Sequence, residues 1–441
     1  MSVLNTLQEE ITGFKKTTNT VYPEMGRVED VIGLVIQSRG PSARIGDVCH
    51  ILDVETQDLI VKAEVVGFRD GKIQLMPFGE LENLAVGSWV MNTHKPLTVS
   101  LSHALKGRIL DALGNPLDQF GPVFCEETRP ILATPPDAMS RDRITEILPL
   151  GVRALDGFLT MGQGQRMGIF AGSGVGKSTL QGMIARNTQA DINVIALIGE
   201  RGREVREFIE DALGEEGLSR SIVIVATSEQ APVLKIKAAL TAATIAEWFR
   251  DQGLNVMFML DSVTRIAMAL REVGLAIGEP PTSRGYTPSV FTFLPKLLER
   301  CGTSDVGSIT GLYTVLVEGD DFNEPIADAV RGILDGHIVL SRELAYQNHF
   351  PAIDILSSVS RLMHTISEPE HRQAAGEIRD LIATYQKSED IISIGAYVQG
   401  ANAKLDKAVQ LKDAIDQFLK QDVLEDEPFD TACQKLKQIL S

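Results

Sequence analysis

Cysteine is scarce in this sequence, and the few cysteines are scattered. The four of them, Cys49, Cys125, Cys301 and Cys433, lie far apart, and no C-x-x-C pair occurs. A disulfide framework needs cysteines at close and regular spacing, and a structural zinc site needs paired ligands. Neither is expected here, and four free thiols suit a reducing cytoplasm.

Long apolar runs are also missing. No stretch approaches the roughly 18 residues of a membrane-spanning helix, and the N-terminus lacks the charged start and apolar centre of a signal peptide. We therefore expect a cytoplasmic protein that works at a membrane, if at all, only as a peripheral visitor.

Positive charge and aromatic side chains are in short supply. The chain has 59 acidic against 42 basic residues, a formal net charge of −17, and only 5% aromatic residues. A large surface for nucleic acid needs excess positive charge, often with aromatic side chains on which bases stack. Nucleic acid is therefore a disfavoured partner.

The chain has 441 residues, enough for about two to four domains. Within residues 1–24, apolar side chains recur at helical spacing from Leu4 to Phe14, which predicts an amphipathic helix. Such a helix either packs on its own protein or forms a partner-binding tail. Residues 25–94 hold short β-rich pieces separated by glycine, which predicts a small β-barrel domain.

Residues 95–363 alternate between strand-like and helix-like segments. The apolar runs "RMGIFA", "NVIALIG", "SIVIVAT" and "NVMFML" are separated by stretches such as "EVREFIEDAL" and "LKIKAALTAATIAEWF". This alternation predicts an α/β fold, with a parallel sheet covered by helices on both faces. Residues 364–441 are charged and helical, and we expect a separate helical domain there.

A glycine-rich segment, "IFAGSGVGKSTL", follows the first of these runs. It fits the phosphate-binding P-loop pattern except that Ala171, also a small residue, replaces the first glycine. Backbone amides from Gly172 to Lys177 can cradle phosphates, Lys177 adds a positive charge, and the Ser178 hydroxyl can ligate Mg²⁺. An ordinary glycine-rich turn is the alternative.

Two carboxylates end or follow apolar runs. Asp261 ends "NVMFMLD", the position from which a carboxylate holds Mg²⁺ in P-loop enzymes. Glu200 follows "NVIALIG", which delivers it to the carboxyl edge of the sheet, where it can deprotonate an attacking water. Buried strands often end in aspartate, and a glutamate at a helix start favours the helix dipole. The neighbouring Arg201 can reach a phosphate or pair with an acid.

Other candidates have ordinary interpretations when taken alone. Arg361, after the serine-rich turn of "ILSSVSR", is typical of a surface salt bridge, and Phe350 is typical of a core residue. His337 and His349 show no metal-ligand spacing and are expected to be structural.

Several long motifs resemble a known family. "PAIDILSSVS" fits the signature of the rotary ATP synthase α/β superfamily, while "GERGRE" and "PSVFTFLPKLLERCG" are similar to its protein-export branch. "IFAGSGVGKST", "EVVGF" and "LMPFGE" most resemble the flagellar type III export ATPases. The resemblance runs from about Met25 to about Asp406. It implies a RecA-like P-loop core with an N-terminal β-barrel and a C-terminal helical domain.

The resemblance also implies roles for individual residues. Lys177 and Ser178 bind phosphate and Mg²⁺, Glu200 activates water, and Asp261 also serves Mg²⁺. Arg201 lies near the γ-phosphate of ATP, Phe350 stacks on adenine, and Arg361 is an arginine finger inserted into the neighbouring subunit's site. The nucleotide-binding set is Gly172, Ser173, Gly174, Val175, Gly176, Lys177, Ser178, Thr179 and Phe350.

The family assembles as a hexameric ring with nucleotide sites between neighbours. Because this one chain carries both Glu200 and Arg361, a homohexamer is complete in itself. The loop at 274–289 matches loops that face the ring channel, where a central stalk protein binds, and the N-terminal helix corresponds to one that binds a stator-like regulator. One departure is "GAYVQGANA", in which Asn402 and Ala403 replace the branch's usual Asp-Pro.

The function implied is Mg-dependent ATP hydrolysis that energises flagellar type III protein export beneath a membrane export gate, with handling of export substrates and chaperones. The nearest alternative is the ATPase of a virulence type III secretion injectisome. A hexameric RNA translocase and a non-catalytic nucleotide-binding subunit are the alternatives from other classes. The acidic, aromatic-poor composition disfavours the first, and Glu200 disfavours the second.

Overall fold

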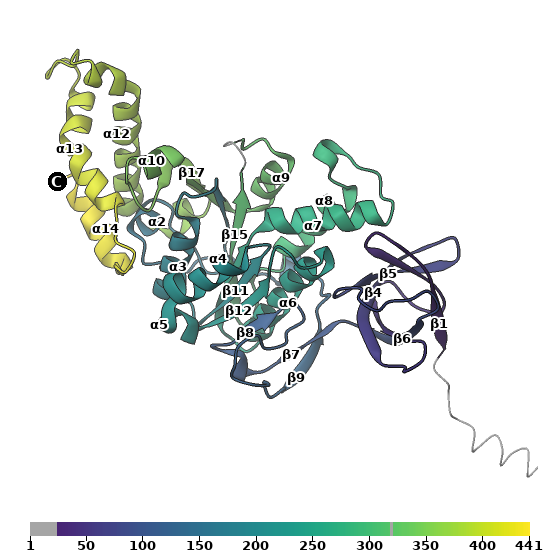
Figure 1. Ribbon diagram of the computed structural model, residues 1–441. Coiled ribbons are helices and arrows are strands. Elements are labelled where there is room, and N and C mark those ends of the chain that lie inside the picture. The colour runs from purple at the N-terminus through teal and green to yellow at the C-terminus, as the bar shows by residue number, and fades with distance from the viewer. Residues whose placement is uncertain (1–23, 318–320) are drawn as a thin grey trace, which may run out of the picture. The chain divides into compact units, whose positions relative to one another are not determined.

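The computed structural model describes residues 24–317 and 321–441 of the chain (Figure 1). The amphipathic helix expected between Leu4 and Phe14 lies outside the described residues. The chain divides into two compact units, the first ending at Leu97 and the second beginning at Thr98.

The first unit contains a closed six-stranded antiparallel barrel, in the order β1-β2-β5-β4-β3-β6, which confirms the predicted barrel. Its interior is lined by alternate residues such as Val61, Ala63 and Val65 of β4, because successive side chains of a strand point to opposite faces. The strands are β1 (Met25–Ile32), β2 (Val35–Arg39), β3 (Asp47–Leu52), β4 (Leu59–Arg69), β5 (Lys72–Pro77) and β6 (Trp89–Pro96).

The second unit is built on a nine-stranded sheet in the order β17-β16-β10-β15-β13-β11-β12-β8, with β14 paired to β15. Neighbours are parallel except for β17 on β16 and β14 on β15. The strands are β8 (Ile109–Asp111), β10 (Arg166–Ala171), β11 (Ile192–Ile198), β12 (Ser221–Ala226), β13 (Asn255–Asp261), β14 (Gly302–Thr303), β15 (Ser308–Leu316), β16 (Gly336–Leu340) and β17 (Ile353–Ser360). A two-stranded ribbon pairs β7 (Thr98–Leu101) with β9 (Glu127–Pro130).

Helices cover both faces of this sheet (Figure 1). Ile195 and Met257 share a core cluster with α3, whereas α6 packs on β11, β12 and β13. Both faces are buried, so the strands are continuously apolar. The helices are α2 (Arg153–Phe158), α3 (Lys177–Asn187), α4 (Gly202–Glu207), α5 (Gly214–Ser219), α6 (Pro232–Asp251), α7 (Val263–Ala276), α8 (Pro288–Leu298), α9 (Pro325–Ile333) and α10 (Arg342–Tyr346). The shorter turns are η1 (His103–Leu105), η2 (Ala138–Ser140), the π-helical η3 (Phe208–Leu213) and η4 (Ser283–Gly285).

The C-terminal part is helical, as predicted, and consists of α11 (Met363–Ile366), α12 (Pro369–Ser393), α13 (Ala403–Leu419) and α14 (Phe429–Gln438). These helices pack on β17 and α2 and share one core cluster with the sheet. Asn402 is the N-cap of α13, because its side-chain oxygen accepts hydrogen bonds from the amides of Lys404 and Leu405 at 3.1 and 3.3 Å. Asparagine caps helices as well as aspartate does, so the departure at Asn402 preserves the cap.

Candidate functional site

The P-loop connects β10 to α3 at the carboxyl edge of the sheet. Gly174 and Gly176 have φ angles of 78° and 86°, in the left-handed region that residues with a Cβ rarely adopt. At Gly172, a Cβ would lie 2.5 Å from a guanidinium nitrogen of Arg342. The backbone conformation therefore favours glycine at Gly174 and Gly176, whereas a larger residue at Gly172 would have to displace the end of the Arg342 side chain.

Ala171 replaces the first glycine of the motif without strain. It is the last residue of β10, is 1% exposed, and does not have a positive φ. Its carbonyl oxygen accepts a hydrogen bond from the amide of Val317 at 3.0 Å. The position is part of the sheet, where a small side chain packs normally.

Lys177 begins α3 and lies between two carboxylates. Its Nζ is 2.6 Å from Asp261 Oδ1 and 3.4 Å from Glu200 Oε1. Asp261 ends β13 and Glu200 follows β11, so adjacent parallel strands deliver both carboxylates to the same edge. The structure thus brings together the lysine and the two acids that the sequence singled out.

Burial and charge oppose each other in this cluster. Burial by itself lowers the pKa of Lys177, but the negative charges of Asp261 and Glu200 outweigh it and raise that pKa above its ordinary value. Burial also raises the pKa of Glu200, against the nearby Lys177 ammonium, and the carboxylates of Asp261 and Glu204 add to the rise. A carboxylate with a raised pKa is suited to accept a proton near neutral pH.

Hard oxygen ligands lie where Mg²⁺ is expected. The side chain of Ser178 is in the first turn of α3 and its residue is exposed, while Asp261 is held by Thr314, whose hydroxyl donates to Oδ1 at 2.7 Å. Mg²⁺ in phosphate-binding sites is usually held by one or two protein oxygens together with substrate phosphates. Ser178 and Asp261 fit that donor set.

Arg201 lies outside the Lys177 cluster in this structure. Its side chain is 77% exposed, and its Nη1 is 3.5 Å from Glu204 Oε1, one turn along α4. Glu204 in turn shares a hydrogen bond with Glu200. Arg201 is therefore linked to Glu200, the candidate base, by way of the Glu204 carboxylate.

Phe350 lies against the P-loop and is not a core residue. A Cβ at Gly176 would be 3.5 Å from its Cδ1, and the residue is 40% exposed. Its carbonyl oxygen accepts a hydrogen bond from the amide of Gln421 at 3.0 Å, which joins it to the segment after α13. An exposed ring beside a phosphate-binding loop is placed to stack on a planar base.

Arg361 lies at the opposite edge of the same sheet. It follows Ser360, which pairs with Gly336 at the start of β16, and its amide donates to the carbonyl of Asp335 at 3.0 Å. The register places Ser360 four residues before Ala171 along β10, or roughly 13 Å at about 3.3 Å per residue. Arg361 is exposed, and its Nη2 donates to the carbonyl of Arg331 at 3.4 Å.

Two further arginines belong to the site and were not found from the sequence. The Arg342 guanidinium packs over Gly172, and the side chain of Arg265 packs over Gly199, just before Glu200. The buried Nε of Arg265 has no hydrogen-bond partner among residues 24–317 and 321–441. Both contacts join segments far apart in the chain, so no local pattern indicates them.

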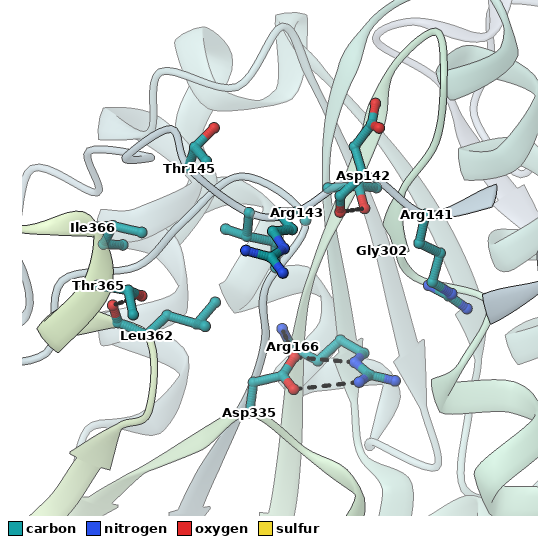
Figure 2. A pocket seen from close by; sticks show the side chains of 13 residues that line it. Arg141, Asp142, Arg143, Thr145, Arg166, Gly302, Asp335, Leu362, Thr365 and Ile366 are labelled. Carbon is teal, nitrogen blue, oxygen red and sulfur yellow. Dashed lines mark hydrogen bonds and ion pairs between the residues drawn. The ribbon is translucent and has the colours of Figure 1, made fainter. Parts of the chain in front are cut away.

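A cavity of about 530 Å³ lies at the same edge of the sheet as Arg361, away from the P-loop. Figure 2 shows Arg166 facing Asp335, which its Nε and Nη2 contact at 3.1 and 3.3 Å, with Arg143 projecting into the space above them. Leu362, directly after Arg361, also lines it. Arg166 is already paired with Asp335, and none of the described residues that line this cavity belongs to a phosphate-binding loop.

Comparison with known proteins identifies the family. Residues 151–360 match the nucleotide-binding domain, and residues 28–94 the β-barrel domain, of the ATP synthase alpha/beta family. Residues 367–438 match the T3SS EscN ATPase C-terminal domain. The chain is 56% identical to a flagellum-specific ATP synthase of Bacillus subtilis, over 92% of each chain. It is 50% identical to a type 3 secretion system ATPase of Xanthomonas euvesicatoria, over 94% of this chain and 93% of that one.

Solved structures agree with these matches. The assembled ATPase EscN from the type III secretion system of enteropathogenic E. coli superposes with a TM-score of 0.89 at 46% identity, covering 94% of this chain and all of EscN. EscN in complex with its central stalk EscO gives a TM-score of 0.87 at 45% identity. The chain therefore belongs to the ATP synthase alpha/beta family, in the group that contains the flagellum-specific and type 3 secretion ATPases.

Proposed function

We propose that this chain hydrolyses ATP with Mg²⁺ to energise flagellar type III protein export, acting as a homohexameric ring. One observation carries the proposal. Lys177 lies between Glu200 and Asp261 at one edge of the sheet, while Arg361 is exposed at the other. One copy thus offers a phosphate-binding loop with a base, and its neighbour offers the missing cation.

The mechanism follows from these placements. The amides from Gly172 to Lys177 hold the phosphates, and the Lys177 ammonium exchanges its carboxylate partners for phosphate oxygens. Glu200 then loses its cation and orients a water, accepting its proton at a carboxylate oxygen. Mg²⁺, when bound by Ser178 and Asp261, supplies positive charge to the phosphates. Phe350 stacks on the adenine and Arg201 approaches the γ-phosphate.

Arg361 of the neighbouring copy completes the site. An arginine finger stabilises the charge of the transferring phosphoryl group and is worth roughly 10³ to 10⁵ in rate, or about 4 to 7 kcal/mol of barrier. Because interfaces in a ring are heterologous, each copy both receives a finger and gives one.

Partners follow from the same assignment. The complex of EscN with its central stalk EscO supports a stalk protein in the ring channel of this protein, at the loop 274–289. We further propose a stator-like regulator at the N-terminal tail, export gate membrane proteins, export substrates and chaperones as partners. The protein would act in the cytoplasm, at the inner face of the cell membrane. Among the described residues, no helix is long and apolar enough to span a membrane.

A virulence injectisome is the second candidate system, because a type 3 secretion system ATPase is 50% identical to this chain. The chemistry is the same in both systems. Restored motility when the chain is expressed in a flagellar ATPase deletion strain supports the flagellar assignment, and restored injectisome secretion alone contradicts it.

The enzymatic test uses two variants with different expected failures. Lys177→Ala abolishes productive binding of Mg-ATP, because the phosphates lose their cation. Glu200→Gln leaves nucleotide binding intact and stops hydrolysis, because the amide cannot accept the proton. Fluorescent-nucleotide binding and phosphate release measure the two steps. The control is Glu207→Gln, at an exposed residue of α4, the helix that begins shortly after Glu200. Wild-type turnover by Glu200→Gln contradicts the assigned base.

The same assays separate the remaining alternatives. A non-catalytic subunit binds ATP without hydrolysing it, so turnover by the purified chain excludes that role. An RNA translocase is stimulated by single-stranded RNA, and we expect the ATPase rate to be unchanged by RNA. Activity per subunit should rise with protein concentration, because each site is completed by a second copy.

A further inference from the structure

A second cavity, of about 310 Å³, lies between the sheet and the C-terminal helices. It is lined by residues of α10, β17, α12 and α13, all within the second compact unit. The volume is within the range of small-molecule sites. Its apolar wall is formed by the buried side chains of Ile353, Ile355, Leu381, Ala408, Ile415 and Leu419.

His349, one of the lining residues, has a buried polar atom without a hydrogen-bond partner among the described residues. The residue is 6% exposed, and the atom is its Nε2. Burial lowers the pKa of the imidazole, although the charge of Asp416 opposes this, so the ring is neutral near pH 7. A buried polar atom without a partner is costly, and a ligand that hydrogen-bonds to it removes that cost.

The polar lining of the cavity is predominantly acidic. Glu343, Asp354, Glu389 and Asp416 contribute carboxylates, whereas Lys412 is the one cation among the residues lining it. Lys412 is already bound to Asp416, and its Nζ lies 5.3 Å from the centre of the Tyr385 ring. Glu343 and Glu389 have no ion-pair partner in the described parts of the chain. Lys420 acts on His349 and Arg379 on Asp354 from outside the lining, but the lining itself carries more carboxylates than cations and so favours a cationic ligand.

Two residues adjacent in the chain, His349 and Phe350, lie at the cavity and at the candidate nucleotide site. His349 lines the cavity, while the ring of the next residue, Phe350, lies 3.5 Å from the Cβ position of Gly176. The amide of His349 is held by the carbonyl of Leu344 at 2.9 Å, and Leu344 is itself part of the cavity wall. We therefore expect a ligand in the cavity to affect the position of Phe350, because His349, which lines the cavity, is its neighbour in the chain.

We propose that this cavity is a binding site for a small amphipathic amine, with a flat apolar body against β17 and α13, a hydrogen bond to His349 Nε2, and an ammonium group near Glu343 and Glu389. Its occupancy changes nucleotide affinity through Phe350. The second statement rests on the proposed nucleotide site, whereas the first does not.

Three probes that share one ring test the binding statement. Fluorinated tryptamine, indole and indole-3-acetate carry positive, zero and negative charge, and fluorine NMR measures their binding to the full-length protein. We expect tryptamine to bind most tightly and indole-3-acetate most weakly. Equal affinity for the three, or tighter binding of the anion, overturns the proposed amine class.

Matched variants locate the site. Ile382→Trp fills the cavity from α12, while Ile391→Trp adds the same ring at an exposed position of the same helix outside the cavity. We expect at least about a tenfold loss of tryptamine affinity for the first and none for the second. His349→Phe keeps the bulk, removes the unsatisfied nitrogen, and should weaken binding about tenfold without lowering the melting temperature. Unchanged binding in both cavity variants overturns the proposed site.

The coupling is tested by titrating tryptamine with and without Mg-ADP. Coupling is reciprocal, so we expect Mg-ADP to change tryptamine affinity by about fivefold or more, and to have no effect in Lys177→Ala. No change in a wild-type chain that binds Mg-ADP overturns the coupling alone. A chain that binds tryptamine but not Mg-ADP contradicts the proposed function, and the coupling with it, while the cavity site stands.

Discussion

The two edges of the central sheet carry opposite arrangements of charge. At the carboxyl edge, Lys177 lies in a partly buried cluster with Asp261 and Glu200, which compensates the charges within one chain. At the amino edge, Arg166 is paired with Asp335, whereas Arg361 is exposed and its guanidinium contacts only the carbonyl of Arg331 among the described residues, at 3.4 Å.

This difference separates the Lys177 cluster, which we expect to change partners when a ligand binds, from Arg361, which we expect to find its partner in a neighbouring copy. The charges of the Lys177 cluster are compensated within the chain, and under the proposed mechanism phosphates would displace the carboxylates. Arg361 cannot reach its own P-loop, because the length of the strands separates the two edges. If Arg361 is an arginine finger, as proposed, it can act only on the next copy in a ring, and each chain then supplies two half-sites.

Removal of the exposed cation should have the largest effect. Arg361→Ala is expected to lower kcat by about 10³ to 10⁵-fold, because the transition-state charge loses its counterion. Nucleotide affinity should change little, since the P-loop is intact. Steady-state phosphate release at saturating Mg-ATP, together with fluorescent-nucleotide titration, separates the two quantities.

Arg361→Lys sharpens this result. Lysine keeps the charge but lacks the planar fork that contacts two phosphate oxygens, so recovery should be small. As a control, Arg69→Ala removes an exposed arginine at the end of β4 and should leave kcat unchanged. Full activity of Arg361→Ala at high protein concentration would show that each site is complete within one chain.

Mixing two inactive variants tests whether the half-sites belong to different copies. In a mixed ring, the intact P-loop of an Arg361→Ala chain can meet the intact finger of a Lys177→Ala chain. With equal amounts of the two variants, random assembly places an intact P-loop next to an intact finger at about a quarter of the interfaces. About a quarter of the wild-type activity should therefore return on mixing. The measurement is ATPase rate against mixing ratio, and no recovery at any ratio contradicts a finger acting between copies.

The carboxyl-edge cluster should also set the acid limit of activity. Glu200 must be ionised to accept a proton, and its pKa is raised. As the pH is lowered, the rate should therefore fall about tenfold per pH unit, and the fall should begin above the ordinary glutamate pKa of about 4.3. Glu204→Gln removes a neighbouring carboxylate that contributes to this rise. The acid limb of kcat/KM should therefore move to lower pH, and an unmoved limb would contradict Glu200 as the titrating base.

The smallest effect is expected from the ion pair at the amino edge. Asp335→Asn leaves Arg166 without one of its carboxylates and should lower the free energy of unfolding by about 1 to 3 kcal/mol. Because this pair lies at the amino ends of the strands, away from the P-loop, we expect the loss to be the same with and without Mg-ADP. Thermal unfolding in both conditions measures it, and Asp261→Asn, which should lose the nucleotide-induced stabilisation, is the comparison.

Much of the fold was predictable because its signals are local. The four apolar runs became β10, β11, β12 and β13, and the glycine-rich motif lies between β10 and α3. The site was less predictable. Arg342 reaches the P-loop and Arg265 reaches Gly199, just before Glu200, from distant segments, and Arg201 pairs with Glu204 instead of joining the cluster. His349 was expected to be structural, but its burial, its unsatisfied nitrogen and the cavity beside it had no sequence signal.

The sequence by itself determined the P-loop, the strands that end at Asp261 and shortly before Glu200 and, through family resemblance, the roles proposed for Phe350 and Arg361. The P-loop and the strands could be predicted because they depend on backbone conformation and on the spacing of apolar residues, both of which neighbouring residues set. Only the tertiary structure decided that Lys177 lies between Asp261 and Glu200, that Arg361 is on the other edge, and that a cavity lies behind Phe350. Those facts depend on strand order and register, which arise when segments hundreds of residues apart pack together.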